Sequence, residues 1–161
     1  MGQVFAIDAA LAWRDAQHAV GHTVALTNGH FDLLHVGHVR YLQAARGLAD
    51  ALIVGLNSDA STAARKPGRP VVPEDERAEL LAALGCVDAV VVFDALTAEA
   101  LVESLRPDIY VKGGDWNRPE GPRPPEAAVV ERYGGRVAYL PYVPDRSTSA
   151  IIARVRALAE G

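Results

Sequence analysis

The stretch that decides the fold reads Thr27-Asn28-Gly29-His30-Phe31-Asp32-Leu33-Leu34-His35-Val36-Gly37-His38. A β-rich run, His22–Thr27, leads into it, and a run with apolar residues at helical spacing, His38–Arg46, follows it. Gly29 allows a close backbone turn at the strand end, where a phosphate could approach without meeting a Cβ atom. Free N–H groups and the positive end of the helix dipole form an anion site where the helix begins. His35 and His38 add N–H donors that can follow charge as it grows on a phosphoryl group. The stretch therefore predicts a phosphate site between a strand and a helix.

Spacing alone leaves two other interpretations of this stretch open. His30, His35 and His38 fall within nine residues, so a zinc site competes with phosphate binding. The i, i+3 pair could share a metal ion, but no carboxylate or cysteine is obviously placed as a further ligand. The histidines could also be ordinary structural side chains.

Outside this stretch, short β-rich runs alternate with longer helical runs. The predicted strands are His22–Thr27, Ala51–Leu56, Ala89–Phe93, Ile109–Val111 and Arg136–Pro141. The predicted helices are Ile7–Ala19, His38–Arg46, Glu74–Ala83, Thr97–Leu105, Pro125–Tyr133 and Ser149–Ala159. This alternation predicts an α/β fold, a Rossmann-like parallel sheet with helices on both faces. We expect a single domain over residues 1–161, with 1–21 as an N-terminal helical extension and 22–161 as the core.

Composition narrows the class of protein. The 161 residues carry a formal net charge of −4, which argues against a general nucleic-acid binder. The single cysteine, Cys86, excludes a disulfide within the chain and is expected to be a small buried core residue. No run is long and apolar enough to span a bilayer, and Met1–Ala16 does not resemble a signal peptide. We therefore expect a cytoplasmic protein without a membrane partner.

The run Gly29-x-Phe31-Asp32-x-x-His35-x-Gly37-His38 resembles the signature of the cytidylyltransferase-like nucleotidyltransferases. The resemblance implies that His35 and His38 contact a nucleoside triphosphate. Lys112 lies at the end of a predicted strand beside two glycines that permit close backbone approach, so we expect it to contact the ligand as a third catalytic residue. The resemblance also implies a magnesium-dependent attack on an α-phosphate, with release of pyrophosphate. The implied nucleotide-binding residues are Thr27, Asn28, Gly29, Phe31, Gly37, Ser147, Thr148 and Ser149.

Further stretches resemble one branch of that family, the D-glycero-D-manno-heptose 1-phosphate adenylyltransferase domain of bacterial heptose-phosphate enzymes. They are Asn57-Ser58-Asp59, Lys66-Pro67-Gly68-Arg69-Pro70, Pro73 through Arg77, and Val111-Lys112-Gly113-Gly114-Asp115-Trp116. This resemblance implies ATP and a heptose 1-phosphate as substrates, Mg²⁺ as cofactor, and a separate sugar kinase upstream. The implied substrate-binding residues are Asp32, Asn57, Asp59, Lys66, Arg69, Arg77, Gly114, Asp115 and Trp116.

Several alternatives stay open at the level of sequence. Lys66 and Arg69 could be solvated surface charges, Arg77 could form a structural ion pair, and Asp115 could hold magnesium through water or cap a loop. A cytidylyltransferase for glycerol 3-phosphate or a related polyol phosphate is the alternative enzyme, although Tyr142 replaces an arginine typical of that branch. Arg146 stands where a small residue is expected. A binding module without turnover is the non-enzymatic alternative. A homodimer is compatible with the family, but no residue pattern identifies an interface.

Overall fold

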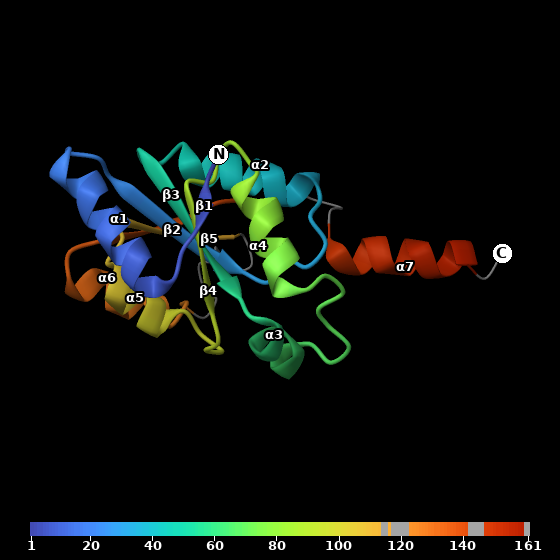
Figure 1. The fold of residues 1–161 in the computed structure, drawn as a ribbon. Helices are drawn as coiled ribbons and strands as arrows, with labels where there is room; N and C mark the ends of the chain where they lie inside the picture. Colours follow the sequence, from blue (N-terminus) through green and yellow to red (C-terminus); the bar gives the residue numbers. More distant parts are fainter. Residues whose placement is uncertain (114–115, 117–122, 142–146, 160–161) are drawn as a thin grey trace.

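The fold is built on one parallel sheet. The computed structural model describes residues 1–113, 116, 123–141 and 147–159. Across these residues the strands are β1 (Gln3–Val4), β2 (Val24–Gly29), β3 (Ala51–Asn57), β4 (Ala89–Phe93), β5 (Ile109–Lys112) and β6 (Arg136–Tyr139). They pair in the order β1-β4-β3-β2-β5-β6, and every pair is parallel (Figure 1). The predicted α/β fold with a Rossmann-like parallel sheet is thus confirmed.

Helices cover both faces of the sheet. Those in the described ranges are α1 (Ile7–Ala19), α2 (Val36–Arg46), α3 (Asp59–Arg65), α4 (Glu74–Ala82), α5 (Glu99–Leu105), α6 (Glu126–Arg132) and α7 (Thr148–Ala159). Successive strand side chains point to opposite faces, so Val24 and Leu26 pack with α1, α5 and α6, while Ala25 packs with α2 and α4. The two apolar clusters that result hold the helices on either side of the sheet (Figure 1).

The switch in strand order positions the candidate site. β2 pairs with β3 on one side and with β5 on the other, so the chain crosses the sheet in opposite directions on the two sides of β2. In open parallel sheets the crevice beyond the strand ends at such a switch point is where ligands bind. The carboxyl ends of β2 and β5, at Gly29 and Lys112, lie at this crevice.

Element boundaries differ from the sequence prediction in informative places. β2 reaches Gly29, so Asn28 belongs to the strand and its side chain is held by the sheet register. The sequence did not predict β1, which has two residues and pairs Gln3 with Ala89, within the segment expected to be a helical extension. It also did not predict α3, whose N-cap Ser58 accepts a hydrogen bond from Ser61 N.

The prediction that Cys86 is a buried core residue needs correction. Its side chain is only half-buried and packs against the edge of the cluster beneath α4. The reason is local: Cys86 lies in the turn between α4 and β4, and its neighbour Val87 takes the core position instead.

Helix α7 differs from the others in its surroundings. It extends away from the body of the molecule (Figure 1), and none of its residues is buried. Val155 and Leu158 on it are largely exposed. None of the helices in the described ranges has the length and apolar character needed to cross a membrane.

Candidate active site

A cavity of about 520 Å³ lies at the carboxyl ends of β2 and β5 and gathers most of the predicted site residues. They come from elements far apart in the chain: the strand ends, the start of α2, the end of α3 and the start of α7. The predicted residues that line the cavity are Asn28, Gly29, Phe31, His35, Gly37, His38, Asn57, Lys66, Lys112, Trp116, Ser147, Thr148 and Ser149. Gly114 and Asp115 lie outside the described residues, as do Tyr142 and Arg146.

The two histidines of the signature form a stacked pair at the start of α2. His35 is the N-cap residue in extended conformation, and His38 follows in the first turn. Their ring centroids are 3.8 Å apart, and Phe31 packs edge-on against His38 at 5.3 Å. A Cβ atom on Gly29 would stand 3.0 Å from the Phe31 ring, so glycine is what lets this aromatic ring close the strand end. The pair is therefore held rigidly at the helix N-terminus.

The environment keeps His30 and His38 neutral near pH 7. Burial, followed by the nearby His35, lowers the pKa of His38 to about 4, although a backbone hydrogen bond with Leu33 opposes the shift. Burial, followed by the charges of Lys66, Arg65 and Arg77, likewise lowers the pKa of His30 to about 4. A neutral imidazole offers one N–H donor, so His38 suits hydrogen bonding to an oxyanion more than ion pairing.

Lys112 is held at the end of β5 by a buried polar group of side chains. Its ammonium donates to Asn28 Oδ1 at 2.9 Å, and the Tyr110 hydroxyl donates to the same oxygen at 2.7 Å. The ring of Trp116 lies 5.6 Å from Lys112 Nζ. Burial lowers the pKa of Lys112, and the carboxylate of Glu126 opposes that shift. Asn28 thus fixes the direction in which the Lys112 ammonium points.

Thr27 supports this arrangement from behind the cavity. It is completely buried, and its hydroxyl is 2.7 Å from the hydroxyl of Tyr41. Tyr41 in turn donates to the main-chain oxygen of Val111 at 3.1 Å. Thr27 therefore ties β2 to α2 and β5 and is not among the residues that line the cavity.

Asp32 clamps the loop that carries Lys66. One carboxylate oxygen accepts hydrogen bonds from Val71 N at 2.7 Å and Val72 N at 3.1 Å, and the other accepts from Arg69 Nη1 at 2.6 Å. Burial raises the pKa of Asp32, but the bonds from Arg69, Val72 and Val71 outweigh it, so the pKa is lowered overall. Asp32 is buried and lies outside the cavity lining, so its carboxylate holds this loop over the site.

Arg77 occupies a similar supporting position under the same loop. Its side chain is 0% exposed, and its guanidinium donates to the main-chain oxygens of His30, Asn57 and Val72. A fourth hydrogen bond, of 2.6 Å, reaches the carboxylate of Asp59. Arg77 and Asp59, predicted to contact substrate, therefore lie behind the cavity and tie three segments of chain together.

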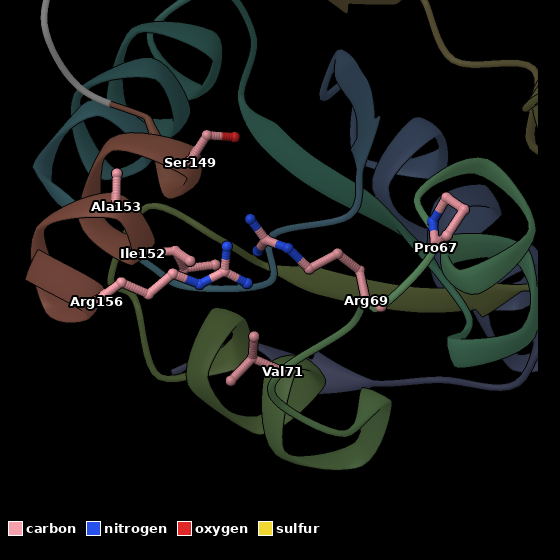
Figure 2. Close-up of a pocket in the computed structure, with 8 residues that line it drawn as sticks. Pro67, Arg69, Val71, Ser149, Ile152, Ala153 and Arg156 are labelled. Carbon is pink, nitrogen blue, oxygen red and sulfur yellow. The ribbon is translucent and has the colours of Figure 1, made fainter. Parts of the chain in front are cut away.

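A second, smaller cavity of about 420 Å³ adjoins the first, with Ser149 on both linings. Arg69 points into it from the loop and Arg156 from α7 (Figure 2). The structure thus places Arg69, a predicted substrate-binding residue, next to the main cavity and in an ion pair with Asp32. At the start of α7, Ser147 Oγ accepts a hydrogen bond from Ala150 N at 3.1 Å, as an N-cap residue does.

Some cavity residues were missed by sequence reasoning. Tyr41 follows His38 by three positions on α2, so helical spacing could have placed it on the same face. No sequence pattern indicated that Arg65, next to Lys66, or Glu126, at the start of α6, would line the cavity. His30, considered only as a possible metal ligand, lines the cavity and bonds Thr62 Oγ1 through Nδ1 at 3.0 Å. Within the described ranges, no group of three or more His, Cys, Asp or Glu side chains is placed to hold a metal ion.

The sheet, its switch point and the histidine pair at a helix N-terminus define a class of nucleotide-handling α/β protein. This chain belongs to the cytidylyltransferase-like family, whose sequence profile matches residues 26–154. Its class of enzyme is therefore that of the nucleotidyltransferases.

Two individual proteins and one solved structure are similar to this chain. The bifunctional protein HldE of Syntrophotalea carbinolica is 56% identical over 140 residues, which are 84% of this chain and 27% of that protein. The protein of the same name from Geotalea uraniireducens is 51% identical over 151 residues, which are 93% of this chain and 30% of that protein. The chain thus spans less than a third of the length of these relatives. Among solved structures, the lipopolysaccharide core biosynthesis protein from Thermoplasma volcanium is similar, with a TM-score of 0.60 and 26% identity over 76% of this chain and 98% of that one.

Proposed function

We propose that this chain transfers AMP from ATP to a heptose 1-phosphate, giving ADP-heptose and pyrophosphate. The observation that carries the proposal is the gathering of His35, His38, Lys112 and Ser147–Ser149 in one cavity from three separate parts of the chain. The relatives named bifunctional protein HldE support the adenylyltransferase branch. The resemblance of Lys66–Pro70 and Val111–Trp116 to the heptose branch supports the acceptor.

In the proposed reaction, an oxygen of the sugar phosphate attacks the α-phosphorus of ATP. The bond from that phosphorus to the oxygen bridging to the β-phosphate breaks, and pyrophosphate leaves with both electrons of the bond. A phosphate monoester is largely ionised at pH 7, so no strong general base is needed. His35, His38 and Lys112 would stabilise the charge that develops on the transferred phosphoryl group. Ser147 and the free N–H groups at the start of α7 would bind the outer phosphates.

Magnesium is proposed to enter as part of the nucleotide substrate. Among the described residues of the lining, Glu126 is the only carboxylate, and it faces Lys112. These residues do not build a magnesium cage of their own, which agrees with an ion held by nucleotide phosphates and water. When bound, the ion would neutralise phosphate charge.

The function is tested by a product assay with two nucleotides and two acceptors. ATP and CTP are each incubated with heptose 1-phosphate and with glycerol 3-phosphate, in the presence of Mg²⁺, and pyrophosphate and nucleotide-sugar products are measured. We expect ADP-heptose from ATP with heptose 1-phosphate alone. Product from CTP only would overturn the proposal in favour of the cytidylyltransferase alternative. Thermal stabilisation by nucleotide without product from any acceptor would favour a binding module.

Three further proposals accompany this function. A separate sugar kinase would supply the heptose 1-phosphate, the chain would work in the cytoplasm, and it would form a homodimer. The division into an N-terminal extension, 1–21, and a catalytic core, 22–161, is also a proposal. Sedimentation of the purified chain at several concentrations measures its oligomeric state directly.

A further inference from the structure

Glu126 is a buried carboxylate on the wall of the candidate active site. It is 2% exposed and lies in the first turn of α6, where it belongs to the cavity lining. One oxygen, Oε1, accepts a hydrogen bond of 2.9 Å from Ala98 N, just before α5. The other, Oε2, is buried without a hydrogen-bond partner among the described residues and lies 3.8 Å from Lys112 Nζ. Glu126 is thus anchored on one side and faces the lysine on the other.

A buried carboxylate is costly unless a positive charge compensates for it. The compensating charge here is Lys112, which itself is buried and held on its other side by the neutral oxygen of Asn28. Among the described residues, the other ionisable groups that act on or contact Lys112 are Tyr110 on β5, whose ring is 5.2 Å away, and Arg65 on α3, whose charge acts on it more weakly than that of Glu126. Arg65 repels the ammonium and burial disfavours it, so Glu126 supplies the negative charge that this part of the site needs.

We propose that Glu126 is a positioning residue for Lys112: its carboxylate keeps the lysine ionised and directed along Asn28 into the cavity. The catalytic use of Lys112 rests on the proposed function, whereas the pairing of Glu126 with Lys112 does not. Glu126 would act through Lys112 and would make no contact with the reacting phosphates, from which its negative charge would be repelled.

The substitution Glu126→Gln separates charge from structure. Glutamine keeps an oxygen that accepts the hydrogen bond from Ala98 N, and it has nearly the same volume, but it carries no charge. Glu131→Gln on the same helix is the matched control because Glu131 is half-exposed and pairs with Arg123 at the surface. Circular dichroism and thermal unfolding first establish that both variants are folded.

The chain offers a direct measurement of the lysine charge because Lys66 and Lys112 are its only two lysines. The protein is labelled with lysine carrying ¹³C at Cε, and both resonances are followed by NMR as a function of pH. In Glu126→Gln we expect the pKa of Lys112 to fall by roughly one to three units, since an opposite charge at this distance has been removed. The pKa of Lys66, and that of Lys112 in Glu131→Gln, should stay as in the wild type. An unchanged Lys112 pKa in folded Glu126→Gln would overturn the proposal.

The pH dependence of turnover gives a second readout that a merely structural defect would not produce. Loss of the carboxylate should move the alkaline limb of kcat to lower pH, because Lys112 then loses its proton earlier as pH rises. Lowering the pH should therefore restore most of the activity of Glu126→Gln. A decrease by the same factor at every pH would contradict the proposal. If the wild type turns over no acceptor, the proposed function fails, and the lysine titration still decides the pairing of Glu126 with Lys112.

Discussion

At the scale of single residues, the stacked histidines show how burial selects a chemical role. His38 lies between His35 and the edge of Phe31, and burial holds its pKa near 4. A cationic imidazole would attract phosphate from a distance, but a neutral one donates a directed hydrogen bond. In a cavity such a donor stabilises a transition state without reorganising when charge appears. The histidine pair is therefore better suited to stabilising the transition state than to the initial binding of the nucleotide.

The first prediction concerns His38→Ala. We expect pyrophosphate release to fall by at least about 100-fold, because a preorganised donor to the phosphoryl oxygens is lost. The fold should persist, since the sheet and its two apolar clusters do not depend on this side chain. Steady-state kinetics and circular dichroism measure the two effects. His22→Ala removes an exposed histidine far from the cavity and serves as control; near-normal turnover in His38→Ala would exclude the proposed mechanism.

At the scale of elements, one loop connects the signature stretch to the helices beyond it. Asp32 binds three donors on the segment that contains Arg69, and Arg77 beneath it binds three main-chain oxygens. These contacts fix the loop whose first residue, Lys66, lines the cavity. The loop is thus positioned by two side chains, Asp32 and Arg77, that lie outside the cavity lining.

The second prediction tests the Asp32 clamp. Asp32→Asn keeps an acceptor for the amides of Val71 and Val72 but loses the ion pair with Arg69, so we expect about 1–3 kcal/mol of lost stability. Hydrogen exchange should show faster exchange of those two amides, and KM should rise more than kcat falls. Asp94→Asn, at another loop site, is the control. Unchanged protection of both amides would show that the clamp does not order the loop.

The third prediction concerns Arg77→Lys. Lysine has a single ammonium and cannot reach the four acceptors that the fork of Arg77 serves, so we expect the free energy of unfolding to fall by about 3 kcal/mol. Denaturant unfolding measures it. Arg132→Lys alters a surface pair and should cost less than about 1 kcal/mol. Equal effects in the two variants would mean that the buried network contributes little to stability.

Sequence reasoning found the elements whose patterns are local and missed those that depend on distant partners. β4 was predicted at its observed bounds because a short run of Val between polar residues is typical of a buried strand. β1 has two exposed residues and exists only because β4 lies beside it, so no pattern within the segment could predict it. α3 is short, and its sequence, rich in Ala, Ser and Thr, resembles a loop as much as a helix.

The candidate site shows the same division. His35, His38, Lys112 and Ser147 could be predicted from residue types at the ends of elements, and the cavity brings them together. The supporting positions of Asp32 and Arg77 could not, since a charged residue near a site looks the same in sequence whether it faces the ligand or the loop. The place of Glu126 in the site could not be predicted from the sequence. Its contacts with Lys112 and Ala98 exist only because the fold brings these distant residues together.

At the scale of the whole molecule, two half-buried histidines make stability depend on pH. His30 and His38 have a pKa of about 4 in the folded protein and about 6.5 when unfolded. Between these values the unfolded chain binds more protons than the folded one, so stability is highest above about pH 6.5 and is lost as pH falls toward 4.

The fourth prediction follows from this loss of stability at lower pH. Tm should decrease as the pH is lowered from about 7 to 5, and the double variant His30→Asn with His38→Asn should show a smaller decrease over that window. Differential scanning calorimetry at constant ionic strength provides the measurement. The pKa of Asp32 is lowered as well, but it acts at more acidic pH and leaves this window unaffected. A Tm that is equally sensitive to pH in both proteins would contradict the claim that His30 and His38 cause the loss of stability.

The central place of β2 also matters for a chain that is still being synthesised. β3 follows β2 closely along the chain and can pair with it early, but the other neighbour, β5, emerges much later; Asn28 and its partner Lys112 are 84 positions apart. Until then one edge of an apolar strand stays open, and such edges invite aggregation or capture by chaperones. The polar side chains that mark the cavity therefore meet only after the 84 positions from Asn28 to Lys112 have been synthesised, and a nascent chain carries the signature stretch long before it can hold a nucleotide.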